Sequence, residues 1–159
     1  MKKKTQIDHE QMMRKALAQA RVALRRDEVP IGAVVIDATG TIIGRGHNAI
    51  ETVGCQTAHA EVRAIEQACR KVGNWRLEGC SIYVTLEPCL MCFGLIGLSR
   101  LSNVVYGAQS PLFGSGLDNK ECFPVYSKGL HIMGGVLKDE SIDLLQDFFK
   151  KRRAQKGST

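Results

Sequence analysis

The sequence predicts an α/β protein, a three-layer α/β/α sandwich built around one sheet. Its 159 residues favour one domain with a single core, so we treat residues 1–159 as one unit. A content of 44% hydrophobic and 24% charged residues is typical of a folded domain. Expected helices and strands alternate along the chain, and this alternation favours a sheet covered by helices on both faces.

Four helices are expected from the spacing of apolar residues. In the first, Met13, Leu17 and Leu24 fall on one face, and Asp8 with Gln11 forms a capping pair at its start. The third is apolar nearly all round, so we expect it to be buried, with Pro88 at its first turn. The expected helices are residues 8–26, 58–72, 89–98 and 141–154, followed by a flexible tail at 155–159.

Five short segments are rich in β-branched and apolar residues and are expected to be strands. The turn-forming residues 37–40 separate the first two, which predicts a β-hairpin. Residues 49–57 are expected to form a loop, and residues 109–128 a longer loop with at most a short helix. The expected strands are residues 31–36, 41–46, 81–86, 103–108 and 130–136.

The net charge of +6 is unevenly distributed. Residues 1–28 carry eight Lys/Arg and four Asp/Glu, and residues 148–159 carry five Lys/Arg and no acidic residue, so the segment between them is net acidic. Positive charge at both ends suits a polyanionic partner that contacts the terminal helices. Charge alone supports equally well the simpler interpretation that basic termini keep the protein soluble.

No targeting or membrane segment is expected. The basic start, residues 1–4, is followed by polar residues rather than by the apolar stretch of a signal peptide, and no apolar segment reaches the length of about 18 residues that could span a membrane. We therefore predict a cytoplasmic protein. In that compartment metal binding or burial is expected of the cysteines rather than disulfides. The six are Cys55, Cys69, Cys80, Cys89, Cys92 and Cys122.

Two motifs carry the chemistry, residues 58–61 (AHAE) and residues 87–92 (EPCLMC). Together they match H-x-E…P-C-x-x-C, the established signature of zinc-dependent nucleobase deaminases. Each falls at the start of an expected helix. Two helix N-termini that meet at one sheet edge would bring His59, Cys89 and Cys92 together as ligands of one Zn²⁺ per chain, with a fourth position open. Glu61 then remains as the acid and base beside it.

Two other uses of the cysteine pair are open from the residues alone. Cys89 and Cys92 could form a redox pair, an interpretation that leaves the histidine and glutamate motif unused. A closed structural zinc site is the second, with a fourth ligand taken from Cys80, Cys55 or His47.

With these motifs, the sequence resembles the zinc-dependent cytidine deaminase-like superfamily and, within it, the bacterial tRNA-specific adenosine deaminases. The resemblance runs from about residue 9 to residue 153. It implies a five-stranded mixed sheet, a homodimer, zinc bound by His59, Cys89 and Cys92, and Glu61 as the proton shuttle. The segments that carry it are residues 28–34, 46–48, 57–61, 83–92 and 147–153.

The resemblance also implies substrate contacts. Asn48 would hydrogen-bond the target base, the Ala60 N–H would contact the substrate, and the terminal helix would grip RNA across both subunits. The basic residues of that helix are Lys150, Lys151, Arg152 and Arg153. Two places depart from the family pattern. Residues 109–111 (Gln-Ser-Pro) stand where relatives commonly have an aspartate, and His47 replaces an aromatic residue of some relatives.

The implied reaction is hydrolytic deamination of adenosine to inosine at the wobble position of a tRNA anticodon, with release of ammonia. A base in the anticodon stem-loop suits this reaction because extruding an unpaired base costs least. Two other functions are open. One is a small-molecule deaminase that acts on guanine, cytosine or a nucleoside, and the other is a non-enzymatic RNA-binding protein with a structural zinc.

Overall fold

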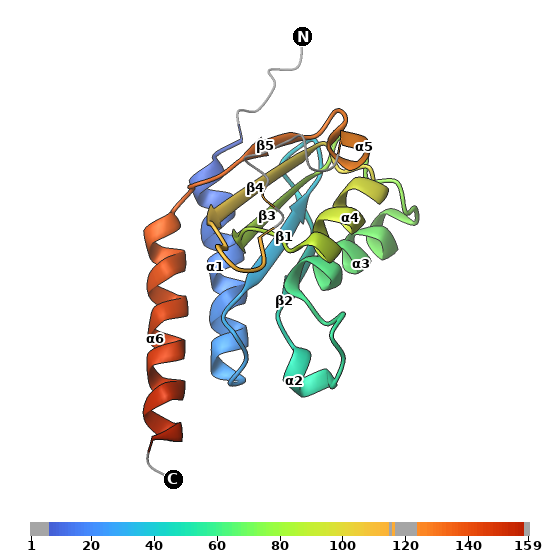
Figure 1. The fold of residues 1–159 in the computed structure, drawn as a ribbon. Helices are drawn as coiled ribbons and strands as arrows, with labels where there is room; N and C mark the ends of the chain where they lie inside the picture. The colour runs from blue at the N-terminus through green and yellow to red at the C-terminus, as the bar shows by residue number, and fades with distance from the viewer. Residues whose placement is uncertain (1–6, 115, 117–123, 158–159) are drawn as a thin grey trace.

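A five-stranded mixed sheet forms the centre of the computed structural model, which describes residues 7–114, 116 and 124–157 (Figure 1). The strand order is β2-β1-β3-β4-β5. β1 pairs antiparallel with β2 and β3, whereas β3–β4 and β4–β5 are parallel, so the predicted mixed sheet is confirmed. The strands are β1 (Gly32–Ile36), β2 (Ile42–His47), β3 (Ser81–Leu86), β4 (Asn103–Ala108) and β5 (His131–Met133).

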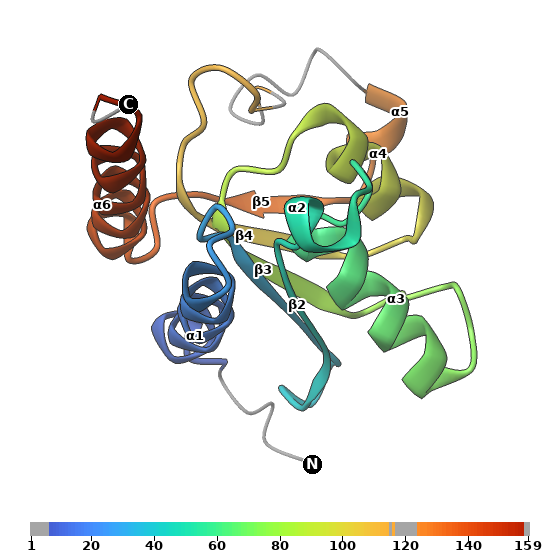
Figure 2. The same cartoon turned by 90° about the horizontal axis from the view of Figure 1, so that it is seen from below.

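Helices cover both faces of this sheet, which gives the three layers that the sequence predicts. Figure 2 shows α1 and α6 on one side of the strands and α3 and α4 on the other. The Asp8 carboxylate accepts a hydrogen bond from the Gln11 N–H at 3.0 Å, which confirms the expected cap. The helices are α1 (His9–Arg25), α2 (Ile50–Val53), α3 (Ala60–Val72), α4 (Leu90–Leu98), α5 (Pro124–Ser127) and α6 (Lys138–Lys156).

β1 shows why a doubly covered sheet needs an apolar strand. All five of its residues are buried. Ala33 and Val35 belong to the core cluster beneath α3 and α4, whereas Val34 and Ile36 belong to the cluster beneath α1. Successive side chains of a strand point to opposite faces, so a continuous apolar run fills both cores at once.

β2 allows α3 to approach unusually closely because it carries glycine where the helix crosses it. A Cβ atom at Gly44 would overlap the carbonyl oxygen of Ala64, and one at Gly46 would overlap that of Ala60. The facing residues of α3, Ala60 and Ala64, are fully buried and small. Small residues on both elements thus bring the start of α3 against the end of β2, which fixes where that helix begins.

Several expected boundaries are wrong in detail. A short helix, α2, stands in the segment expected to be a loop at 49–57. β5 is shorter than expected, because the chain turns at Gly135, where φ is +87°. α6 starts before residue 141 and continues to Lys156, so it includes part of the expected flexible tail, while residues 158–159 lie outside the described residues. Much of the expected loop 109–128 also lies outside them, and α5 is the short helix within it.

The expectation that α4 is buried all round is wrong. Phe93 and Ile96 are buried, but Leu90 and Met91 are exposed, and Leu98 is 63% exposed. The helix packs only one side against the protein, so these three apolar side chains face solvent. Pro88 was expected at the first turn of α4, but it precedes Cys89, the N-cap of that helix.

Within residues 7–114, 116 and 124–157, none of the helices has both the length and the apolar character that crossing a membrane requires.

The close contact between β2 and α3 predicts a large effect of a single methyl group. Gly46→Ala should lower the free energy of unfolding by at least ~1–3 kcal/mol, because its Cβ overlaps backbone that cannot move without shifting α3. Gly94→Ala, in α4, is the matched control, since a Cβ there meets no atom within 4 Å. Urea denaturation of both variants measures the difference, and equal stability of the two would contradict this packing account.

Candidate active site

α3 and α4 begin side by side, and their N-cap residues are His59 and Cys89. The contact of Gly46 with Ala60 holds the start of α3 against the sheet, and β3 leads directly into the start of α4. Neither N-cap side chain makes the usual capping hydrogen bond. Neither side chain therefore caps its own helix, and both lie where the two helix ends converge, as the sequence predicts.

Three donor atoms meet at this point. The Nδ1 atom of His59 lies 3.7 Å from the Cys89 Sγ and 3.4 Å from the Cys92 Sγ, and all three donors lie within 4.8 Å of one another. Tetrahedral zinc with ordinary Zn–S and Zn–N bond lengths would place a sulfur and a nitrogen ligand about 3.6 Å apart. The donor set thus fits zinc in both chemistry and spacing.

The protonation of these groups also favours a cation. Hydrogen bonds from the Cys92 thiol and from His59 lower the pKa of Cys89 to about 4. The same contact with Cys89 raises the pKa values of Cys92 and of His59. The Cys89 thiolate therefore carries one negative charge, which hydrogen bonds from the protonated Cys92 and His59 stabilise. A divalent cation would replace those protons, and the positive ends of α3 and α4 stabilise the resulting thiolates.

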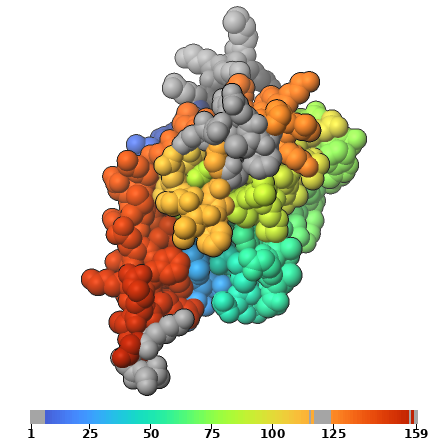
Figure 3. All heavy atoms as spheres, in the orientation of Figure 1, coloured from blue at the N-terminus to red at the C-terminus, as the bar shows by residue number. Residues whose placement is uncertain are grey.

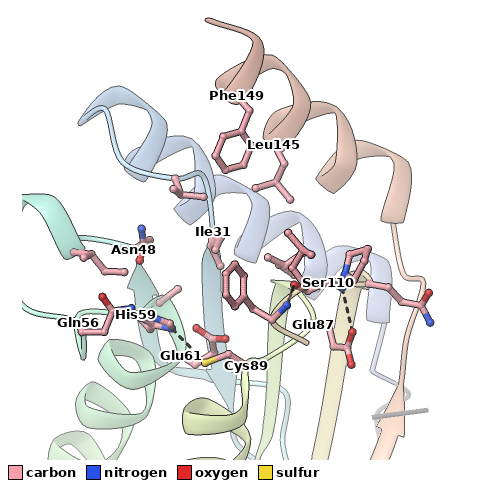
Figure 4. A pocket seen from close by; sticks show the side chains of 18 residues that line it. Ile31, Asn48, Gln56, His59, Glu61, Glu87, Cys89, Ser110, Leu145 and Phe149 are labelled. Carbon is pink, nitrogen blue, oxygen red and sulfur yellow. Dashed lines mark hydrogen bonds between the residues drawn. The ribbon is translucent and has the colours of Figure 1, made fainter. Parts of the chain in front are cut away.

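Glu61 lies beside this cluster, in the first turn of α3. It is 4% exposed, and burial raises the pKa of its carboxyl group to about 6. Figure 4 shows its carboxylate next to Cys89 and His59 at the base of a pocket. A carboxyl group with this pKa can both accept and return a proton near neutral pH.

The pocket above the cluster has a volume of about 580 Å³. The sequence-predicted residues Asn48 and Ala60 line it, together with His59, Glu61 and Cys89. The remaining wall comes from distant segments, which the sequence did not identify. These contributions are Val29 and Ile31 before β1, Ile50 and Gln56 around α2, Leu86 and Glu87 after β3, residues 109–113 after β4, and Leu145 and Phe149 of α6.

A buried carboxylate fastens one of these walls. Glu87 accepts a hydrogen bond at 3.1 Å from the Ser110 N–H, and a Cβ at Gly114 would overlap the Glu87 carboxylate. The loop is also joined to Cys89 by a β-bridge at Gly114. The departure from the family pattern at residues 109–111 therefore falls in the pocket wall, outside the donor cluster of His59, Cys89 and Cys92.

The four basic residues near the end of α6 lie in two different environments. Lys150, Lys151 and Arg153 are exposed. Arg152 instead donates to the Asp27 carbonyl oxygen at 2.9 Å and lies 3.3 Å from the Asp27 carboxylate. Arg152 therefore joins α6 to the end of α1, whereas the other three cations face solvent, where a partner can reach them.

Among the described residues, no fourth protein ligand joins the donor cluster. Over that part of the chain, the only group of metal-ligating side chains that meets is His59, Cys89 and Cys92. The expected alternatives Cys80 and Cys55 are not part of it. His47 instead contacts the Arg26 guanidinium at 3.3 Å. Cys122 lies outside the described residues.

Fold and site together define a nucleobase deaminase of the H-x-E…P-C-x-x-C class. Comparison with known proteins agrees. The model of the MafB19-like deaminases matches residues 7–153. The chain is 44% identical over 146 residues to the tRNA-specific adenosine deaminase of Bacillus subtilis, covering 91% of this chain and 90% of that protein.

Solved structures give the same result. One, from work on A-to-I editing by tRNA:A34 deaminases at the wobble position of tRNA, has a TM-score of 0.79 and 39% identity over 85% of this chain and 99% of the other. The guanine deaminase of Nitrosomonas europaea has a TM-score of 0.80 and 26% identity over 90% and 85%. The chain belongs to the MafB19-like deaminase family and, within it, to the tRNA-specific adenosine deaminases.

The metal account predicts the effect of removing one ligand. Cys92→Ala should leave less than a tenth of the zinc content of the unmodified protein after dialysis, because two remaining donors bind far more weakly than three. It should also lower the melting temperature. Cys80→Ala is the control, since Cys80 is buried but lies outside the cluster, and elemental analysis of both variants gives the zinc content. Full zinc occupancy in Cys92→Ala would contradict the assignment.

Proposed function

We propose that this protein catalyses zinc-dependent hydrolytic deamination of adenosine to inosine at the wobble position of a tRNA anticodon. One observation carries the proposal. Three donors at two helix N-termini leave the carboxylate of Glu61 unused, and it faces a pocket bordered by the helix that bears the basic residues. Whole-chain similarity to tRNA-specific adenosine deaminases supports the substrate.

The residues of the pocket divide the chemistry among them. Zinc held by His59, Cys89 and Cys92 would supply Lewis-acid activation of the attacking water molecule. Glu61 accepts one proton of this water as its oxygen bonds to the amino-bearing ring carbon, and passes that proton to a ring nitrogen of the adenine. It then carries the proton of the added hydroxyl group to the amine, so that the C–N bond breaks, ammonia departs and inosine remains. Asn48 and the Ala60 N–H orient the base through hydrogen bonds.

The surroundings of the pocket suit a base presented by an RNA loop. Leu145 and Phe149 of α6 line the pocket, and the exposed Lys150, Lys151 and Arg153 follow on the same helix. Phosphates flanking an extruded base would meet these cations. In Figure 3, α6 (red) and the segment around residue 110 (yellow-orange) lie side by side on one face. We infer that the anticodon stem-loop binds on this face.

A homodimer would explain the exposed side of α4. Leu90 and Leu98 of α4 and Val125 and Tyr126 of α5 are exposed, and Tyr126 lies against Gly97 of α4, so the two helices expose apolar side chains next to each other. Monomeric proteins rarely expose such a surface without a partner. We propose that a second copy covers it, that the chain acts as a single deaminase domain, and that the protein works in the cytoplasm, where tRNA is decoded.

The proposed function predicts which class of substrate the protein deaminates. The protein should form inosine and ammonia from tRNA with an adenosine-starting anticodon, and no ammonia from free guanine, cytosine or adenosine. Glu61→Gln keeps the zinc but lacks the proton acceptor, so its rate should fall by roughly 10²–10⁴-fold. Nucleoside analysis and an ammonia assay give the result. Deamination of a free base, with the tRNA left unchanged, would favour the small-molecule deaminase instead.

The proposed RNA contact also predicts the effect of removing charge at the end of α6. The triple variant Lys150→Gln, Lys151→Gln, Arg153→Gln should weaken tRNA binding. It should also reduce the slope of log affinity against log salt by about 0.7–0.9 for each phosphate that these side chains neutralise in the complex.

The matched control is Arg70→Gln, Lys71→Gln, Arg76→Gln. It removes the same charge at the far end of α3, opposite the end that carries His59. Binding titrations at several salt concentrations compare the two. Equal slopes in both triple variants would mean that the basic tail serves solubility alone.

A further inference from the structure

Another buried carboxylate lies near the pocket and has no part in the chemistry described above. Glu28 follows α1 and is only 1% exposed. It receives three hydrogen bonds from α2, from the Glu51 N–H at 3.2 Å, the Thr52 N–H at 2.6 Å and the Thr52 hydroxyl at 2.8 Å. These N–H groups belong to the first turn of α2, so Glu28 caps that helix from a distant part of the chain.

α2 needs this external cap. Its own N-cap is Ala49, which has no side-chain acceptor, and none of its four residues is buried. Figure 1 shows α2 projecting from the sandwich at the end of β2. A single helical turn without apolar packing is not stable by itself. The hydrogen bonds to Glu28 therefore hold the first turn of α2, while the Asn48 and Ala49 N–H groups, which donate to the Ile31 and Ala58 carbonyl oxygens, hold the residues just before it.

The capped segment forms one wall of the pocket. Asn48, Ile50 and Gln56 line the pocket from this side, and Figure 4 shows Asn48 and Gln56 facing Ser110 and Glu87 across it. The zinc-ligating residues and Glu61 belong to α3 and α4 instead. Movement of α2 would therefore disturb the residues that surround the substrate while leaving the metal ligands in place.

Asp27, the residue before Glu28, connects this part of the chain to α6 on the opposite side of the pocket. Asp27 adopts a left-handed conformation, with φ of 58°, and receives the guanidinium of Arg152 from α6. Residues 27 and 28 thus hold α6 on one side and α2 on the other. The geometry supports a positioning role at the junction of two pocket walls, and not only a local contribution to stability.

The negative charge of Glu28 strengthens its hydrogen bonds to α2. Burial by itself would raise the pKa of Glu28, but hydrogen bonds from the Thr52 backbone and hydroxyl and from the Glu51 backbone, together with the nearby His47, keep its pKa below the usual value. The ionised carboxylate therefore accepts all three hydrogen bonds, and bonds to an ionised acceptor are shorter and stronger than neutral ones.

We propose that Glu28 is a positioning residue for substrate binding, which holds the 48–57 segment in place as a pocket wall. The proposal rests on the proposed function, since its kinetic test uses tRNA deamination. Glu28→Gln keeps the size of the side chain but loses one acceptor oxygen and the charge. It should raise KM for tRNA about tenfold, with kcat changed less and zinc content unchanged.

Asp37→Asn is a matched control. The Asp37 carboxylate likewise accepts hydrogen bonds from two backbone N–H groups and one hydroxyl, those of Thr39 and Thr41, but at the β1–β2 turn, outside the pocket. This variant should expose the amides of its own turn to hydrogen exchange and leave KM unchanged. An equal rise of KM in both variants would mean general destabilisation and would overturn the positioning role.

Hydrogen exchange separates this inference from the proposed function. In Glu28→Gln the amides of Glu51 and Thr52 should exchange at least tenfold faster than in the unmodified protein, whether or not the protein edits tRNA. If the unmodified protein forms no inosine, the proposed function fails. If it forms inosine and Glu28→Gln has unchanged KM and unchanged exchange at these amides, the inference fails.

Thr52→Val provides a milder test that does not depend on folding of the first variant. It removes one of the three hydrogen bonds and keeps the backbone contact. It should raise KM about threefold, and the double variant should show less than the product of the two single effects, because both act through one contact. An unchanged KM in Thr52→Val alone would overturn the inference, and so would multiplicative effects on KM in the double variant.

Discussion

The close approach of α3 to β2 is the constraint on which the site depends. Gly44 and Gly46 offer no side chains, and Ala60 and Ala64 fit against them. A larger residue on either element would move the start of α3. Because His59 is the N-cap of that helix and Glu61 lies in its first turn, such a shift would move the proposed metal ligand and the proposed proton acceptor together. Packing therefore determines the geometry of the chemistry here.

The second helix end completes the site electrostatically. Cys89 is the N-cap of α4 and Cys92 lies in its first turn, so two thiols stand where a helix end favours negative charge. Glu61 is affected in the opposite direction. Its burial disfavours the charged carboxylate and brings its pKa close to neutral pH. The pKa of Cys89 is thus lowered and that of Glu61 raised, while contact with Cys89 raises the pKa of Cys92, whose proton a bound cation would displace.

The sequence predicts well that His59, Cys89 and Cys92 meet, because each motif places its donor residues within one turn of a helix start. The three layers follow from the alternation of elements, and β1 is recognisable as a continuous apolar run.

Other features depend on contacts between distant segments. The exposed side of α4 is not predicted, because an apolar sequence does not reveal which sides of a helix pack against the rest of the protein. The pocket walls illustrate the same limit. Nothing in the local sequence of α2 predicts a helix, because its cap is the Glu28 carboxylate, more than twenty residues earlier in the chain.

The central claim is that His59, Cys89 and Cys92 hold one zinc ion with a fourth position open beside Glu61. X-ray absorption at the zinc edge of the purified protein tests it most directly. The account predicts two sulfur ligands at about 2.3 Å and two nitrogen or oxygen ligands at about 2.0–2.1 Å, one of them exchangeable with added small anions. Three or four sulfur ligands, or a site that no small anion perturbs, would contradict it.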